Sequence, residues 1–99
     1  MKLFIDTTDN KKTVVGLDKK TWKVATKEHQ SQQLLGLIDK ILQKKRNSIN
    51  QITEIEVNLG PGSFTGLRVG VSVANALSWA LKVPINGKRV GKLVEPKYE

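Results

Sequence analysis

The sequence predicts an α/β domain in which one mixed sheet of five strands is combined with two main helices. Three short segments near the N-terminus alternate apolar and polar residues at the period of a half-buried strand. Two longer segments, 31–46 and 65–82, instead repeat their apolar residues at helical spacing. Because helices and further strands then alternate, we expect right-handed crossovers and a partly parallel sheet.

The N-terminal segments are expected to form an antiparallel meander. Lys2–Asp6 reads as a buried strand, Thr13–Leu17 as a second strand and Thr21–Thr26 as a third, with polar turns between them. Alternate residues of the third strand share one face, namely Trp22, Val24 and Thr26.

The first helix is predicted to begin with Ser31 as its cap. Its apolar residues fill one face, and they are Leu34, Leu35, Leu37, Ile38, Ile41 and Leu42. The cations Lys44, Lys45 and Arg46 close the helix, where its negative end stabilises them. Ile52–Val57 is predicted as the fourth strand, and the segment from Val83 to Val90 suggests a fifth.

The central stretch from Val57 to Lys82 organises the rest of the chain. It passes from a strand through a cluster of helix breakers into a long helix, for which Thr65 is the expected cap. The breaker cluster consists of Gly60, Pro61, Gly62 and Ser63. The helix after it has an apolar arc wider than the stripe needed to cover one sheet, so part of this arc must meet something else.

Small residues recur every four positions within this apolar arc. They are Gly66, Gly70 and Ala74, with Ser78 at the edge of the arc. Glycine inside a helix costs about 1 kcal/mol relative to alanine, so its repetition at this spacing needs a structural reason. The ridge serves either tight packing inside the domain or close approach of a partner helix.

The opposite stripe of the same helix carries its polar residues, which are Arg68, Ser72, Asn75, Trp79 and Lys82. A tryptophan among polar neighbours either anchors an interface or lies half exposed on its own domain. Arg68 lies in the first turn, where a cation opposes the helix dipole unless an anion meets it. A salt bridge inside the domain and a contact with a partner or anion both remain open.

Composition limits the function classes. The chain has 99 residues, no cysteine and a net charge of +8, from 17 Lys and Arg against 9 Asp and Glu. The absence of cysteine excludes disulfide and thiolate chemistry. With one histidine, His29, expected at the surface or at a helix cap, a metal centre is not predicted. We expect a soluble cytoplasmic protein, since no signal peptide or membrane span is recognisable.

A long motif gives the sequence a family resemblance. The run GPGSFTGLRVG from Gly60 to Gly70, preceded by an Ile5-Asp6-Thr7-Thr8 opening, closely resembles the bacterial TsaB (YeaZ) family, which belongs to the machinery for tRNA N6-threonylcarbamoyladenosine (t6A37). The resemblance extends from Met1 to about Gly87. It implies a single ribonuclease-H-like lobe of the actin/Hsp70 superfamily over residues 1–99, with strand order 3-2-1-4-5. The second lobe of the family is expected to be absent, and the basic charge departs from the family pattern.

The resemblance also locates a candidate phosphate turn. Asp6, Thr7 and Thr8 follow a buried strand where the superfamily builds its first phosphate-binding turn, so they form either a vestigial turn or a working site. The signature loop, Gly60, Pro61, Gly62 and Ser63 with Thr65, precedes a helix N-terminus but lacks the lysine of a P-loop. We therefore interpret it as a structural and docking element.

The sequence predicts a partner subunit without catalytic residues and without a cofactor. The resemblance implies a heterodimer with a TsaD-like threonylcarbamoyl transferase, joined by a TsaE-like ATPase, and alternatively a homodimer when the chain is alone. The predicted interface residues are Gly66, Arg68, Gly70, Ala74, Asn75, Ser78 and Trp79. The competing hypotheses are a minimal nucleotide-binding module built on Asp6, Thr7 and Thr8, and an accessory domain that binds tRNA through its basic charge.

Overall fold

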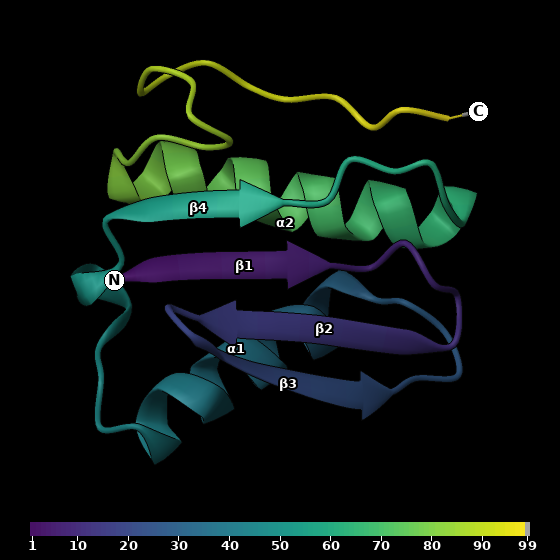
Figure 1. Ribbon diagram of the computed structural model, residues 1–99, viewed down its shortest axis with the longest axis horizontal. Coiled ribbons are helices and arrows are strands. Elements are labelled where there is room, and N and C mark those ends of the chain that lie inside the picture. The colour runs from purple at the N-terminus through teal and green to yellow at the C-terminus, as the bar shows by residue number, and fades with distance from the viewer. Residues whose placement is uncertain (99) are drawn as a thin grey trace.

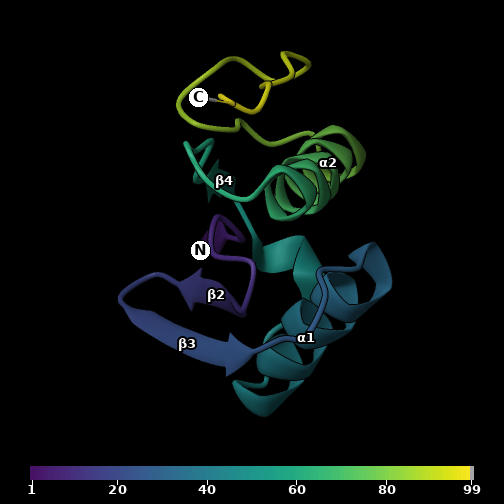
Figure 2. The ribbon, with the colours of Figure 1, turned by 90° about the vertical axis from the view of Figure 1, so that its right-hand side faces the viewer.

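The computed structural model describes residues 1–98 and shows two layers, a sheet and a pair of helices that cover one of its faces (Figures 1 and 2). The sheet contains four strands, β1 (Lys2–Asp6), β2 (Lys12–Leu17), β3 (Lys20–Ala25) and β4 (Glu54–Val57). The helices are α1 (Ser31–Lys44), the short 3-10 helix η1 (Ile49–Gln51) and α2 (Phe64–Leu81).

The strand order is β3-β2-β1-β4. β1 pairs antiparallel with β2, and β2 with β3, which confirms the predicted meander. β4 lies parallel to β1, so the chain crosses over through α1 to reach it. Leu3 and Ile5 of β1 are fully buried at the centre of the core, where the helices pack on the sheet.

The predicted fifth strand is wrong, because the sheet has four strands and not five within residues 1–98. Ile85 forms an isolated parallel bridge with Ile55, at the position where the fifth strand was expected. The chain then leaves the sheet because Asn86 (φ 50°) and Gly87 (φ 74°) adopt left-handed conformations. The Asn86 side chain takes the place of the next backbone partner, since its Oδ1 accepts from the Val57 N–H at 2.8 Å.

Two predicted helix caps are also wrong. α2 is capped by Ser63, whose Oγ accepts from the Gly66 N–H, while Thr65 lies exposed inside the first turn. Ser63 is better placed because its side chain precedes the helix and reaches the third N–H along the chain. The first residue of α1 is Ser31 and its N-cap is Gln30, and no side chain makes a capping hydrogen bond there. The expected end of α1 at the basic cluster is confirmed by Lys44 as its last residue.

Candidate functional site

The predicted phosphate turn is held together by its own side chains. The Asp6 carboxylate accepts hydrogen bonds from the backbone N–H and the hydroxyl of Thr8, at 2.9 and 2.8 Å, and from the Asn58 amide at 3.1 Å. Thr7 is buried, and its hydroxyl donates to the Gly66 carbonyl at 2.5 Å. Each carboxylate or hydroxyl of Asp6, Thr7 and Thr8 therefore has a partner inside the fold.

The charge state of Asp6 follows from these contacts. Partial burial of the carboxyl raises its pKa, but the hydrogen bonds from Thr8 and Asn58, aided by the charge of Lys12, outweigh that effect. The pKa of Asp6 is therefore lower than its usual value. The carboxylate is a structural anion that ties the end of β1 to the end of β4.

The signature loop packs directly on this turn. Ser63 donates its N–H to the Thr8 carbonyl at 2.7 Å. A Cβ placed on Gly62 would lie 2.7 Å from the same carbonyl oxygen, so only glycine lets the two backbones approach this closely. Gly60 has a φ of +107°, and Asn58 accepts its N–H at 3.0 Å. The loop therefore supports the turn, which is the structural part of the role expected for it, whereas its role in docking stays a prediction.

The small-residue ridge of α2 faces the interior of the chain. A Cβ on Gly66 would lie 2.1 Å from the Thr7 carbonyl oxygen, and one on Gly70 would lie 2.1 Å from the Thr7 hydroxyl. Ala74 is fully buried, and Ser78 donates its hydroxyl to the Val83 carbonyl at 2.6 Å. Of the two alternatives left open by the sequence, packing inside the domain holds, because Gly66 and Gly70 face Thr7 and both Ala74 and Ser78 are buried. The prediction that these four residues meet a partner helix is thus corrected.

His29 lies inside the fold and is neither the surface histidine nor the helix-cap histidine that the sequence suggested, since the N-cap position of α1 is Gln30. Its side chain has an exposed fraction of 7%, and its Nε2 lies 2.7 Å from the Asp9 carbonyl oxygen. Because a carbonyl only accepts hydrogen bonds, Nε2 carries the proton, and Nδ1 faces the Thr13 hydroxyl at 3.5 Å. The missing side chain of Gly66 leaves room for the ring, since a Cβ there would lie 2.9 Å from its Cδ2.

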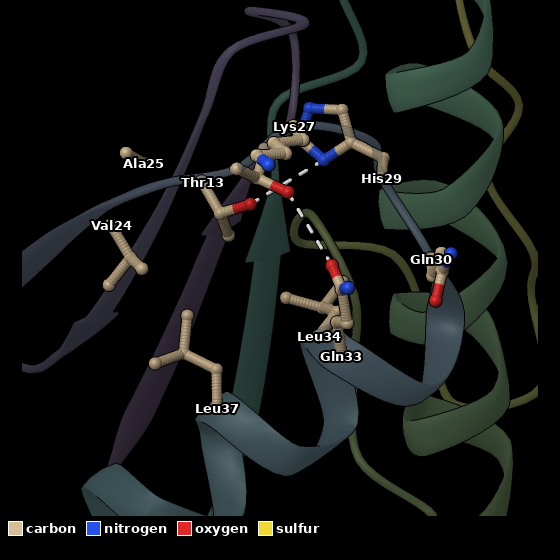
Figure 3. Close-up of a pocket in the computed structure, with 10 residues that line it drawn as sticks. Thr13, Val24, Ala25, Lys27, His29, Gln30, Gln33, Leu34 and Leu37 are labelled. Atoms are coloured by element: carbon tan, nitrogen blue, oxygen red, sulfur yellow. Dashed lines mark hydrogen bonds between the residues drawn. The ribbon is translucent and has the colours of Figure 1, made fainter.

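This histidine closes one end of a groove of about 370 Å³ between β3 and the first turns of α1 (Figure 3). Figure 3 shows Val24 and Leu37 toward the other end, and Gln33 between them and His29. The groove has mixed polar and apolar walls. The hydrogen bonds of His29 link the loop before α1 to β2. We therefore assign His29 a structural role.

The polar stripe of α2 is only partly open to a partner. Asn75 is half-buried, because its amide exchanges two hydrogen bonds with the backbone of Val94, at 2.8 and 3.0 Å. Arg68 is exposed and lies 5.4 Å above the ring of Phe64, a contact that offsets part of its unfavourable position near the helix N-terminus. Trp79 is 72% exposed, although it lines a shallow hollow together with Val90 and Gly91 of the C-terminal segment.

The sequence analysis did not identify the exposed hydrophobic residues that lie near the polar stripe of α2. Residues 89–98 run back along α2 without forming a strand, as Figure 1 shows, and place Tyr98 on Phe64 with ring centroids 4.7 Å apart. Five large hydrophobic side chains are exposed on α2 and this segment, namely Phe64, Trp79, Val90, Leu93 and Tyr98. We call these five residues the α2 apolar surface. Phe64 is part of the GPGSFTGLRVG motif. No local pattern in the sequence, however, predicts that Val90, Leu93 and Tyr98 lie beside a helix.

Among residues 1–98, no three His, Asp or Glu side chains gather in the manner of a metal site. In the same part of the chain, no helix has the length and apolar character needed to cross a membrane.

Comparison with known proteins gives the family. A model described as TsaD, tRNA N6-adenosine threonylcarbamoyltransferase, matches residues 23–87. The tRNA threonylcarbamoyladenosine biosynthesis protein TsaB of Buchnera aphidicola (subsp. Schizaphis graminum) is 36% identical over 61 residues, which are 62% of this chain and 29% of the relative. The protein of that name from Escherichia coli K12 is 32% identical over 66 residues, or 67% of this chain and 28% of the relative. The chain belongs to the TsaB (YeaZ) family.

The fold of this TsaB-family chain has a solved counterpart. YeaZ from Pseudomonas aeruginosa superposes with a TM-score of 0.73 at 22% identity, covering 89% of this chain and 43% of that chain. The likeness confirms an α/β fold with two helices and a mixed sheet. The chain spans less than a third of the length of both TsaB relatives described above, at 29% and 28%.

Proposed function

We propose that this chain is a non-catalytic partner subunit of a TsaD-like threonylcarbamoyl transferase in the synthesis of N6-threonylcarbamoyladenosine in tRNA. It acts in the cytoplasm as one ribonuclease-H-like lobe, and a TsaE-like ATPase joins the larger complex. The names of the TsaB relatives and the match to the TsaD model support this proposal. In the absence of its partner, the same surface supports a homodimer.

The α2 apolar surface is the observation that carries the proposal. Exposed side chains in the chain tend to be polar, yet Trp79 and Leu93 have exposed fractions of 72% and 61%. Aromatic side chains at the centre of an interface contribute much of its binding energy, because they bury large areas at a small cost in side-chain entropy. Arg68, packed on Phe64, adds a charged group to the same surface. These side chains are available without any change in the core.

The test is binding to the TsaD-like transferase of the same organism, measured by calorimetry. Trp79→Ala should weaken binding about 30-fold, which corresponds to about 2 kcal/mol. Because Trp79 is exposed, its replacement should leave the unfolding midpoint nearly unchanged. Ile49→Ala is the matched control, since Ile49 is also an exposed hydrophobic (37%) but lies in η1 and is not part of the α2 apolar surface. Equal affinity of Trp79→Ala and wild type would contradict the proposed surface.

The nucleotide-binding hypothesis is tested separately by titration with ATP and Mg²⁺. All the side-chain oxygens of the Asp6-Thr7-Thr8 turn have partners within the fold, so binding of a phosphate there would break existing hydrogen bonds. We expect no micromolar binding and no formation of threonylcarbamoyl-AMP by the isolated chain. Micromolar ATP binding by the purified chain, or formation of threonylcarbamoyl-AMP, would favour the enzyme hypothesis over the partner subunit.

A further inference from the structure

A concave basic site lies at the end of the molecule opposite α2. Its walls come from the start of β3 and the C-terminal end of α1, and they border an open hollow of about 400 Å³. The residues that line it are Lys20, Thr21, Trp22, Lys44 and Lys45. We call this set the Lys20 site.

The strand register explains how the site forms. Lys20 pairs with Leu17 and Trp22 with Val15, and both partners are buried beneath the helices. Cross-strand partners project to the same face of a sheet, so Lys20 and Trp22 also point to the face that α1 covers. α1 ends at Lys44, and there the side chains of Lys44 and Lys45 approach those of β3.

Three ammonium groups meet at this site without an acidic partner. The contact and charge repulsion of Lys20 lower the pKa of Lys45, and burial and Lys44 add smaller effects in the same direction. Among residues 1–98, the one ion pair within 4.0 Å joins Lys2 and Glu56, which lie on other strands. Cations that repel one another around a hollow are stabilised by an anion that enters it.

We propose that the Lys20 site binds the phosphate backbone of RNA, with the half-buried Trp22 offering its ring to an adjacent base. A positive groove that contains an aromatic side chain is the usual arrangement for binding single-stranded nucleic acid, because phosphates and bases are contacted together. The choice of RNA among polyanions rests on the proposed function in tRNA modification. The site itself rests on the pocket and the lysine cluster.

The position of the site is compatible with a partner on α2. The strand order β3-β2-β1-β4 places the Lys20 site beside β3, whereas the strands that α2 contacts are β4 and β1. α2 also contacts α1. Figures 1 and 2 show α2 and the C-terminal end of α1 at opposite ends of the molecule. A transferase bound to the α2 apolar surface would therefore leave the Lys20 site open to RNA.

The first experiment measures the affinity of the full chain for fluorescent tRNA as a function of salt. The variant K20A/K44A/K45A should bind at least about 10-fold more weakly at 0.1 M salt, and the slope of log K against log salt should fall by about 2 to 3, since each phosphate contact contributes about 0.7 to 0.9. The control K88A/R89A/K92A removes three charges from the C-terminal segment and should leave more of the slope intact. Equal losses in both variants would overturn the proposal in favour of diffuse charge.

The second experiment reports on Trp22 directly. The chain contains two tryptophans, so W79F leaves Trp22 as the one source of tryptophan fluorescence. A single-stranded RNA oligonucleotide should quench this fluorescence, and K20A/K44A/K45A should abolish the quenching. Unchanged emission while RNA binds, or equal quenching by low millimolar inorganic phosphate, would overturn the RNA site. Tighter binding to phosphatidylglycerol vesicles than to RNA would overturn it in favour of a membrane surface.

The outcomes separate this inference from the proposed function. Binding of the TsaD-like transferase is measured with Trp79→Ala and does not involve the Lys20 site. If the transferase binds but the lysine variants retain RNA affinity and salt slope, the RNA site alone is disproved. If RNA binds at Trp22 but no transferase binds, the partner role alone is disproved.

Discussion

At the scale of single residues, one threonine determines why α2 contains glycines. Thr7 is buried at the end of β1, and its carbonyl and hydroxyl oxygens point at Gly66 and Gly70. A strand end and a helix can approach this closely only where the helix has no side chain. The same approach leaves room for the ring of His29. The glycine ridge, which resembles a helix-pairing motif in the sequence, is therefore used within the domain.

Gly70→Ala should destabilise the chain by about 1 to 3 kcal/mol, because the added methyl group would overlap the Thr7 hydroxyl. Gly70→Leu should destabilise the chain more than Gly70→Ala, because the larger side chain overlaps the same hydroxyl. Gly36→Ala is the matched control within a helix, since nothing lies within 4 Å of a Cβ at that position. It should stabilise the chain by about 0.5 to 1 kcal/mol through helix propensity. Urea unfolding measures both, and a Gly70→Ala variant as stable as wild type would contradict the assigned packing.

Asp6 should make stability depend on pH in acid. Its folded-state pKa lies below the unfolded value of 3.8, so its contribution is present above that value and is lost as the pH falls through the folded pKa. Asp6→Asn should therefore be less stable than wild type at pH 7, and the difference should shrink as the pH falls below 3.8 and through the folded-state pKa. Urea midpoints of the two proteins across this range test the prediction. A constant difference at every pH would show that the charge of Asp6 is not what matters.

At the scale of elements, the segment after α2 is held by hydrogen bonds in place of strand pairing. Val94 is buried, and its backbone carbonyl and N–H are both hydrogen-bonded to the Asn75 side-chain amide. Lys97 donates its N–H to the Leu59 carbonyl at 2.7 Å. This segment supplies Val90, Leu93 and Tyr98 to the α2 apolar surface, so its position governs the shape of that surface.

Asn75→Ala should release the segment, because the backbone of Val94 loses both of its partners on α2. We expect a loss of about 1 to 2 kcal/mol in unfolding free energy and faster hydrogen exchange confined to residues 90–98. Ser72→Ala, at an exposed position on the same helix, is the control. Faster exchange throughout α2 would instead mean that Asn75 supports the helix itself.

At the scale of the whole molecule, charge is the dominant feature. A net charge of +8 is distributed over 99 residues, and among residues 1–98 the one ion pair joins Lys2 to Glu56 at 2.5 Å. Self-repulsion of this kind opposes the compact state and is screened by salt.

The melting temperature should therefore rise by several degrees between about 0.02 and 0.3 M NaCl, since about 1 kcal/mol shifts the midpoint of a domain this size by 4 to 8 °C. K20A/K44A/K45A should melt higher than wild type at low salt and respond less to added salt. Scanning calorimetry tests both statements. If these substitutions leave the dependence of the melting temperature on salt unchanged, the charge repulsion that opposes folding lies elsewhere on the molecule.

Much of the architecture could be predicted from local patterns. The period of the apolar residues predicted the meander, both helices and β4, because burial on one face imposes that period directly. The fifth strand could not be excluded in this way, since the left-handed conformation of Asn86 and its side-chain bonds to Val57 depend on the neighbouring strand. Of the candidate site residues, Asp6, Thr7 and Thr8 were recognised, but their hydrogen bonds to Asn58 and Gly66 were not.

The sequence by itself determined the α/β class, the order of the elements and, through the GPGSFTGLRVG motif, the family. These properties reside in periodicity and in contiguous residues, which can be read without knowledge of distant contacts. Only the tertiary structure decided which side of α2 is internal, because Gly66 and Gly70 face a threonine more than 50 positions away. It also brought Lys20 beside Lys44 and Lys45 and laid Tyr98 on Phe64. Such proximities arise from strand register and helix packing, and neither is encoded in any short stretch of the chain.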